Sequence, residues 1–148
     1  MTLVDTHAHL YSEKFNDDIN DVIKRSQDAG VERIYMPNID SKSIDSMLEL
    51  EQNFPGYCIP TMGLHPCHVD KDFEKELYIV DDWLSKRPFV AVGEMGTDLY
   101  WDKTFLKQQQ EAFVYQIRLA KKYKLPIVIH CRDAFDEIFE ILEQEKGE

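Results

Sequence analysis

Short apolar segments with strand character alternate with segments of helical periodicity along the whole of this 148-residue sequence. The strands that this pattern predicts are 3–9, 33–36, 58–62, 89–94 and 127–130. The predicted helices, each with an apolar face, are 16–29, 41–54, 73–85, 104–123 and 135–142. Short connections between alternating strands and helices are typical of a parallel α/β sheet. We therefore expect one α/β domain of five strand-helix units, without a linker or a second domain.

Residues able to bind metal ions follow or end four of these five strands. His7 and His9 lie in the first segment, and because side chains alternate along a strand, both point to the same side and can hold one ion together. His65 follows the third strand, Glu94 ends the fourth, and His130 ends the fifth. Ligands of parallel α/β sheets bind beyond the carboxyl ends of the strands. We expect these five side chains to meet there.

The donor types favour a divalent metal ion. Imidazole nitrogens and a carboxylate suit zinc, manganese or a similar ion, and Glu94 can bridge two ions because it has two oxygens. A carboxylate at the end of an apolar strand is costly unless a cation compensates it. Two such ions would lower the pKa of a bridging water and hold the oxygens of a phosphodiester, which is the chemistry of a hydrolase. Glu94 and His130 are thus the predicted catalytic residues, and the alternative for each is a buried ion pair at a strand end.

A substrate phosphate would need further donors, and His65, Arg132 and Tyr100 are predicted to supply them. Arg132 can bind a phosphate in a bidentate way, and a surface ion pair with Asp133 or Asp136 is the alternative. Tyr100 and its neighbour Trp101 are expected to pack over the end of the barrel, with stacking on nucleic-acid bases as the alternative. Asp98 is predicted either to orient a ligand histidine or to cap a turn.

Composition narrows the class of protein. A formal net charge of -11 and a pI near 4.8 argue against binding of nucleic acid through a broad basic surface, although bound cations could attract phosphate locally. No apolar run approaches the roughly 18 residues of a membrane span, and no signal-peptide pattern opens the sequence, so we expect a cytoplasmic protein without a membrane partner. The three cysteines are widely spaced and predicted to be reduced thiols.

Four stretches, in order along the chain, carry a family resemblance: Asp5-Thr6-His7-Ala8-His9-Leu10, Gly63-Leu64-His65-Pro66, Gly93-Glu94-Met95-Gly96-Thr97-Asp98-Leu99-Tyr100-Trp101 and His130-Cys131-Arg132-Asp133-Ala134. In these stretches the chain resembles the TatD family of metal-dependent deoxyribonucleases, within the amidohydrolase-like hydrolases. Any one stretch is a weak signal, whereas the four together are highly specific.

The resemblance implies a parallel TIM-type (β/α) barrel with a binuclear metal site. His7 and His9 would bind one ion, Glu94 would bridge both, and His130 would bind the second. It further implies two divalent ions (Mg, Mn or Zn) as cofactors, and DNA with an accessible 3′ end as the substrate of a 3′-5′ exonuclease.

The chain departs from the family pattern in two ways. Met95, Thr97 and Leu99 replace the more usual residues around Glu94, which leaves the ligand in place. The family barrel has eight strand-helix units and a TIM barrel needs roughly 250 residues, whereas this chain supplies about five units. The family's last metal-binding histidine and its strand-eight aspartate have no counterpart here. We expect residues 1–148 to be one hydrolase domain, incomplete at its C-terminal end, because five units leave open sheet edges and an exposed interior.

A missing C-terminal segment or a second chain could complete such a barrel. Two other functions stay open from the sequence. The chain could be a metal-binding or assembly module without turnover, which the absent family ligands motivate. It could also hydrolyse an amide or another ester, because a fold does not choose between these chemistries.

Overall fold

The computed structural model describes residues 2–147 and contains the five strands and five α-helices that the sequence predicts. The strands are β1 Leu3–Asp5, β2 Val31–Met36, β3 Cys58–Pro60, β4 Val92–Asp98 and β5 Ile127–Arg132. The helices are α1 Ile19–Asp28, α2 Ile44–Asn53, α3 Phe73–Lys86, α4 Leu106–Tyr123 and α5 Phe135–Gln144. Three short 3₁₀ helices are η1 Glu13–Phe15, η2 Ser41–Ser43 and η3 Pro66–His68. The α/β class is confirmed.

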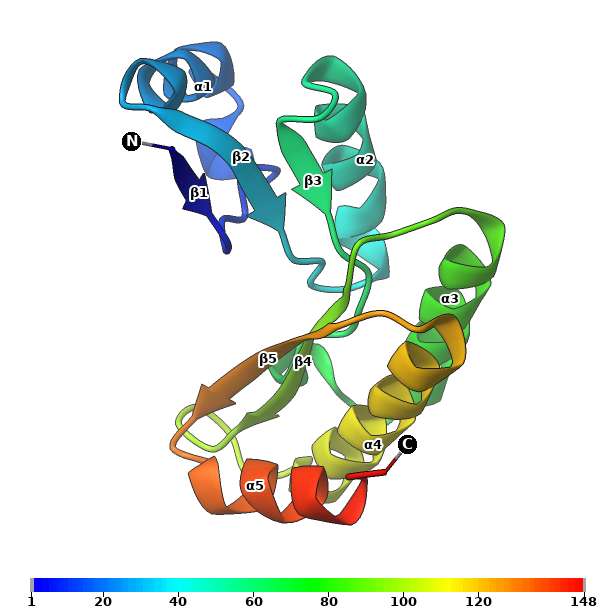
Figure 1. The fold of residues 1–148 in the computed structure, drawn as a ribbon. Coiled ribbons are helices and arrows are strands. Elements are labelled where there is room, and N and C mark those ends of the chain that lie inside the picture. The colour runs from blue at the N-terminus through cyan, green and yellow to red at the C-terminus, as the bar shows by residue number, and fades with distance from the viewer. Residues whose placement is uncertain (1, 148) are drawn as a thin grey trace.

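All strand pairs are parallel and follow chain order. β1, β2 and β3 form one sheet and β4 pairs with β5 in a second. A bridge between Met62 and Val92 connects the two sheets, so the carboxyl ends of all five strands lie toward one region of the molecule (Figure 1). This shared end is where the sequence placed its candidate ligands.

Each α-helix turns an apolar face toward the core, as its periodicity predicts. In α3 the buried residues are Phe73, Leu77, Val80 and Leu84, which recur at spacings of three and four and therefore share one face. These side chains belong to a single buried cluster that also contains residues of β2, β4 and α4. None of the described helices is long and apolar enough to cross a membrane.

β4 begins and ends later than the apolar run around it suggests. The sequence placed a strand at 89–94 with Glu94 last, whereas β4 runs from Val92 to Asp98 and Glu94 is its third residue. The strand continues because it stays paired with β5, where Gly96 lies opposite His130 and Asp98 opposite Arg132. All seven residues of β4 are buried, as predicted for this segment.

Two glycines of β4 let β5 approach closely beside Glu94. Gly93 has a φ of +151°, and a Cβ there would lie 2.6 Å from the carbonyl oxygen of Val128. Gly96 has a φ of +145°, and a Cβ there would clash with the carbonyl oxygen of His130. A side chain at either position would force the two strands apart and move His130 away from Glu94.

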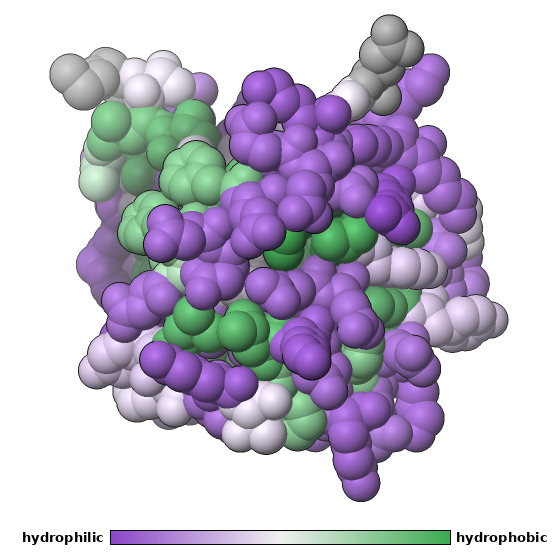
Figure 2. All heavy atoms as spheres, turned by 90° about the horizontal axis from the view of Figure 1, so that it is seen from below, coloured by the Kyte–Doolittle hydropathy of each residue, from purple (hydrophilic) through white to green (hydrophobic). Residues whose placement is uncertain are grey.

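The first and last strands expose apolar side chains. Among residues 2–147, β1 and β5 each pair with one neighbouring strand, and Leu3, Val4 and Ile129 are 41%, 47% and 36% exposed. Phe135 and Phe139 of α5 are exposed as well and stack on each other. Figure 2, which views the molecule from below Figure 1, shows apolar areas among hydrophilic ones on that face. The first and last strands thus carry apolar side chains that the described residues leave exposed.

Candidate metal centre

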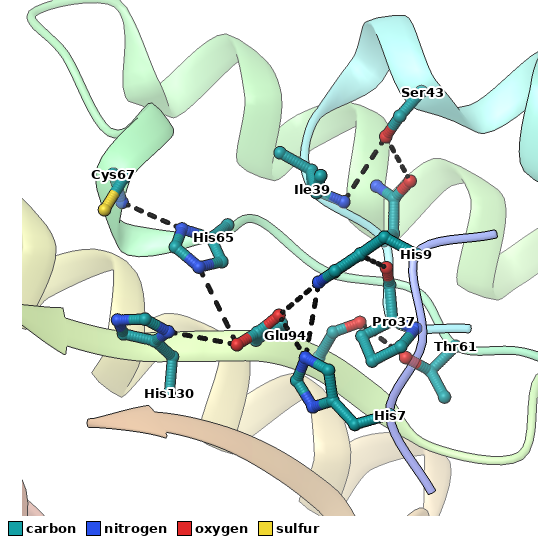
Figure 3. Close-up of polar contacts among 12 residues, drawn as sticks. His7, His9, Pro37, Ile39, Ser43, Thr61, His65, Cys67, Glu94 and His130 are labelled. Carbon is teal, nitrogen blue, oxygen red and sulfur yellow. Dashed lines mark hydrogen bonds and ion pairs between the residues drawn. The ribbon is translucent and has the colours of Figure 1, made fainter. Parts of the chain in front are cut away.

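The five candidate ligand side chains meet around the carboxylate of Glu94 (Figure 3). His7 and His9 lie in the loop after β1, and His65 lies between β3 and η3. The backbone N–H of Ala8 donates to the carbonyl oxygen of Tyr35 in β2, which holds the first loop in place. The backbone N–H of His65 donates to the carbonyl oxygen of Ile39, in the loop after β2, and holds the second. Four chain segments, far apart in sequence, thus converge on one carboxylate.

At one end of the centre, Glu94 faces the first histidine pair. Its Oε2 lies 3.0 Å from His7 Nε2 and 3.3 Å from His9 Nε2, and the two Nε2 atoms are 3.3 Å apart. Oε2 is buried and has no hydrogen-bond partner among the described residues. An ion bound at roughly 2.0–2.2 Å from each donor would fit over this triangle. The orphaned oxygen and the donor set fit a divalent metal ion.

The tautomer of His9 suits a metal ligand. Its Nδ1 lies 3.0 Å from the carbonyl oxygen of Pro37, which can only accept, so Nδ1 carries the proton. Nε2 is then unprotonated, and its lone pair faces Glu94. A second hydrogen bond on the far nitrogen of a ligand histidine orients the ring toward the metal.

At the other end, His130 lies between two carboxylates. Its Nδ1 is 3.0 Å from Glu94 Oε1 and its Nε2 is 2.8 Å from Asp98 Oδ2. Burial alone would lower the pKa of His130, but these hydrogen bonds outweigh burial and raise it. Burial likewise opposes ionisation of Glu94, and the hydrogen bond from His130 together with the neighbouring histidines overcomes it, so the pKa of Glu94 lies far below its usual range. In the metal-free chain this end is a charged network.

His65 is arranged as a neutral donor. Its Nδ1 accepts a hydrogen bond from the backbone N–H of Cys67 at 3.1 Å, so the proton of the neutral ring is on Nε2. Nε2 lies 3.7 Å from Glu94 Oε1. Burial lowers the pKa of His65 to about 4, which keeps the ring uncharged at neutral pH.

Asp98 fulfils both roles that the sequence left open. Its Oδ2 accepts from His130, and its Oδ1 accepts from the backbone N–H of Tyr100 at 3.0 Å. The backbone N–H of Asp98 in turn donates to the buried side chain of Gln109 at 2.8 Å. Asp98 therefore both orients His130 and caps the turn that leaves β4.

Arg132, Tyr100 and Trp101 form an exposed aromatic shelf beside the centre. The guanidinium carbon of Arg132 lies 3.6 Å from the centroid of the Tyr100 ring and 5.3 Å from that of Trp101. Tyr100 is 51% exposed and Trp101 72%, and packing of these rings over the end of a closed barrel stays a prediction. No ion pair of Arg132 with either nearby aspartate occurs among the described residues. Both rings therefore keep much of their surface open to a ligand.

Sequence reasoning missed the polar side chains that fix the loops of the centre. Asn38 is buried after β2 and donates to the Gly63 carbonyl at 2.9 Å. Thr61, also buried, donates to the Gly93 carbonyl at 2.7 Å. Gln116 of α4 accepts from Leu64 N at 2.7 Å. The position of Asn38 at a strand end was an available signal, whereas nothing local distinguishes Gln116 from a surface glutamine of an amphipathic helix.

A cavity of about 400 Å³ opens beside the Asp98 end of the centre. Its lining includes the residues of η3, the start of α3 and the loop after β4. Carboxylates outnumber cations there, with Asp40, Asp70, Asp72, Glu76, Asp98 and Asp102 against Lys42 and Lys75. This cavity is therefore better suited to cations or neutral groups than to a phosphate.

Comparison with known proteins places the chain in a family. A family model described as "TatD related DNase" matches residues 4–148. The uncharacterized metal-dependent hydrolase YabD of Bacillus subtilis (strain 168) is 37% identical over 146 residues, which are 99% of this chain and 57% of that protein. The 3′-5′ ssDNA/RNA exonuclease TatD of Yersinia pseudotuberculosis is 31% identical over 140 residues, 95% of this chain and 54% of that protein.

A solved structure agrees with these relatives. The crystal structure of YjjV, a TatD homolog from Escherichia coli, matches with a TM-score of 0.89 at 32% identity, over 97% of this chain and 56% of that one. The chain spans about half the length of the curated relatives that it matches. By its family match over residues 4–148 and its fold, the chain belongs to the TatD-related DNase family.

Proposed function

We propose that this chain carries the metal centre of a TatD-type hydrolase that cleaves phosphodiester bonds of DNA from an accessible 3′ end. The observation that carries this proposal is the buried Glu94 carboxylate, which contacts histidines from three other segments and has one oxygen without a hydrogen bond to any described residue. Relatives named 3′-5′ ssDNA/RNA exonucleases support the substrate class.

In this proposal the centre holds two divalent ions (Mg, Mn or Zn). His7, His9 and the Oε2 of Glu94 would hold one, and the Oε1 of Glu94 with His130 would hold the other. When bound, the ions would supply an activated water and neutralise the oxygens of the phosphodiester. Glu94 joins the two positions because its two oxygens point to opposite ends of the centre.

The remaining side chains would bind and orient the substrate. His65 presents Nε2–H toward Glu94 and is uncharged, so it can donate to a phosphate oxygen without competing as a cation for the metal positions. Arg132 can donate to the same phosphate from the edge of its guanidinium, since its face is against Tyr100. Tyr100 and Trp101 offer exposed rings on which bases can stack.

Further strand-helix units would close the sheet into a barrel. The support for this part of the proposal is the exposure of Leu3, Val4 and Ile129 on the first and last strands. Soluble proteins cover such edges, because unpaired strand groups and apolar patches favour association. A further segment or a second chain seated along β1 and β5 would bury these side chains.

The test is cleavage of single-stranded DNA by the purified chain with Mn²⁺ or Mg²⁺, compared with Glu94→Ala. One oligonucleotide carries its label at the 3′ end and a second at the 5′ end. We expect metal-dependent release of the 3′ label as a mononucleotide and stepwise shortening of the 5′-labelled strand, both lost in the variant. Cleavage no greater than that of Glu94→Ala, in a chain that still binds metal, would reject nuclease activity for this chain and favour a non-catalytic metal-binding module.

A further inference from the structure

The metal-binding side chains around the centre fall into two groups that share no residue. The ligand atoms of His65, Cys67 and His130 all lie within 4.8 Å of one another, as do those of His7, His9 and Glu94. Figure 3 shows Cys67 on the side of the centre away from His7 and His9. The two groups thus occupy opposite ends of the Glu94 carboxylate.

The hydrogen bonds of the second group indicate which of its members can bind an ion. His65 uses its Nδ1 lone pair to accept from Cys67 N, so its Nε2 keeps a proton and is a donor. His130 has Nε2 at 2.8 Å from Asp98 Oδ2. Asp98 thus orients His130 and leaves Nδ1, which lies 3.0 Å from Glu94 Oε1, as the ring nitrogen that can bind an ion. The thiol of Cys67 lies within 4.8 Å of a ligand atom of His130. A sulfur and an imidazole nitrogen are therefore available beside the Oε1 of Glu94.

The spacing of these atoms suits a tetrahedral ion. With metal–sulfur and metal–nitrogen distances of about 2.3 and 2.1 Å, the sulfur and nitrogen of a tetrahedral site are about 3.6 Å apart. The separation of at most 4.8 Å between Cys67 and His130 reaches this value with a small rotation of the exposed cysteine side chain. The cavity of about 400 Å³, which both Cys67 and Asp98 line, gives an ion access to the position.

We propose that Cys67 adds a thiolate beside His130 and Glu94 Oε1 and so binds a thiophilic divalent ion such as Zn²⁺ at this end of the centre. The proposal rests on the proposed function in that His130 and Glu94 are taken as ligands of the same ion. A thiolate favours Zn²⁺ over Mg²⁺ or Mn²⁺, whereas the histidine and carboxylate donors of the His7 end accept all three. The two ends of the centre would then differ in metal preference, and Cys67 would set the difference.

The test uses Co²⁺ as a spectroscopic substitute for Zn²⁺ in the full chain. A thiolate ligand gives strong near-ultraviolet charge-transfer absorption, and tetrahedral cobalt of any ligand set gives visible bands. We expect both features in the unchanged chain, and we expect Cys67→Ser to lose the charge-transfer absorption and to bind Zn²⁺ at least about 10-fold more weakly. Cys131→Ser is the matched control and should retain both features, and Mg²⁺ binding should be unchanged in Cys67→Ser.

The outcomes separate this proposal from the proposed function. Visible bands without charge-transfer absorption would overturn the role of Cys67 and leave the metal centre intact. Charge-transfer absorption that disappears in Cys131→Ser but persists in Cys67→Ser would also overturn it. No bound cobalt at all would reject both proposals. Because Cys67 is exposed, the serine variant should fold, and circular dichroism of the two variants checks this.

Discussion

The two oxygens of Glu94 face opposite ends of the centre, and the ends differ in what fills them. At the His7 end, three donor atoms lie within 3.3 Å of one another and Oε2 has no hydrogen bond among the described residues. At the His130 end, Oε1 accepts a hydrogen bond and Asp98 accepts another, so protons already balance the carboxylates. An ion at the first end fills a gap, whereas an ion at the second must displace protons. We therefore expect the His7 end to bind an ion more readily.

Glu94→Ala removes the one residue common to both ends and should have the largest effect. Loss of a group that hydrogen-bonds a metal ligand weakens metal binding by about 10- to 100-fold. Loss of a ligand that both ions share should weaken metal binding by more, and at both positions. Calorimetric titration with Mn²⁺ measures this, with the exposed Glu49→Ala of α2 as the control. Retention of two bound ions in Glu94→Ala would contradict the shared-ligand geometry.

Single histidine variants should separate the two ends. His9→Ala removes Nε2 from the His7 end, and we expect the number of bound ions to fall from two to one, with the remaining ion still sensitive to Cys67→Ser. His130→Ala should leave one ion that is insensitive to Cys67→Ser. Titration with Zn²⁺ on the single and double variants checks this. If His9→Ala abolished both ions, the two ends would be one site rather than two.

The pH dependence should belong to the His130 end. Hydrogen bonds to two carboxylates raise the pKa of His130 above its ordinary value of 6.5. A raised folded-state pKa stabilises the metal-free chain below pH 6.5, and this stabilisation is lost as the pH rises through the folded pKa. Metal affinity at this end should instead fall as the pH is lowered, by up to about tenfold per pH unit below the folded pKa of His130. The reason is that His130 must lose one proton before it can bind the ion.

Thermal unfolding in a chelator from pH 6.5 upward measures the stability side of this prediction, and His130→Gln should flatten the curve. Two neighbouring groups titrate outside this range. His65, with a pKa lowered to about 4, changes stability between pH 6.5 and 4, where the charged form becomes favourable in the unfolded chain. Glu94, with its depressed pKa, loses its contribution only as the pH falls below about 4.5. A chelated chain whose stability rose above pH 6.5 would contradict the charged state of His130.

The sequence predicted the position of the centre better than its internal arrangement. Strand ends are visible as apolar runs followed by polar residues, so the grouping of His7, His9, His65, Glu94 and His130 could be expected. The extent of β4 could not, because its last residues are set by pairing with β5 rather than by an apolar run. Whether a ring nitrogen of a histidine can bind a metal or instead donates a hydrogen bond depends on what the other ring nitrogen contacts. For His9 that contact is the carbonyl of Pro37, which is distant in sequence. Such partners are visible only in the folded chain.

Asp98→Asn should have the smallest effect and should act at one end only. An asparagine can still accept from Tyr100 N with its oxygen, but it places a neutral group against His130 Nε2 in place of a carboxylate. The pKa of His130 should then fall toward its ordinary value, because one of the two charges that raise it is gone. Binding of an ion at this end should weaken by about tenfold, as expected for loss of a charged partner, while the His7 end should bind as before. Zn²⁺ titration of Asp98→Asn beside the exposed control Asp21→Asn of α1 measures both positions. Equal weakening at both ends would show that Asp98 supports the fold of the whole centre rather than the orientation of His130.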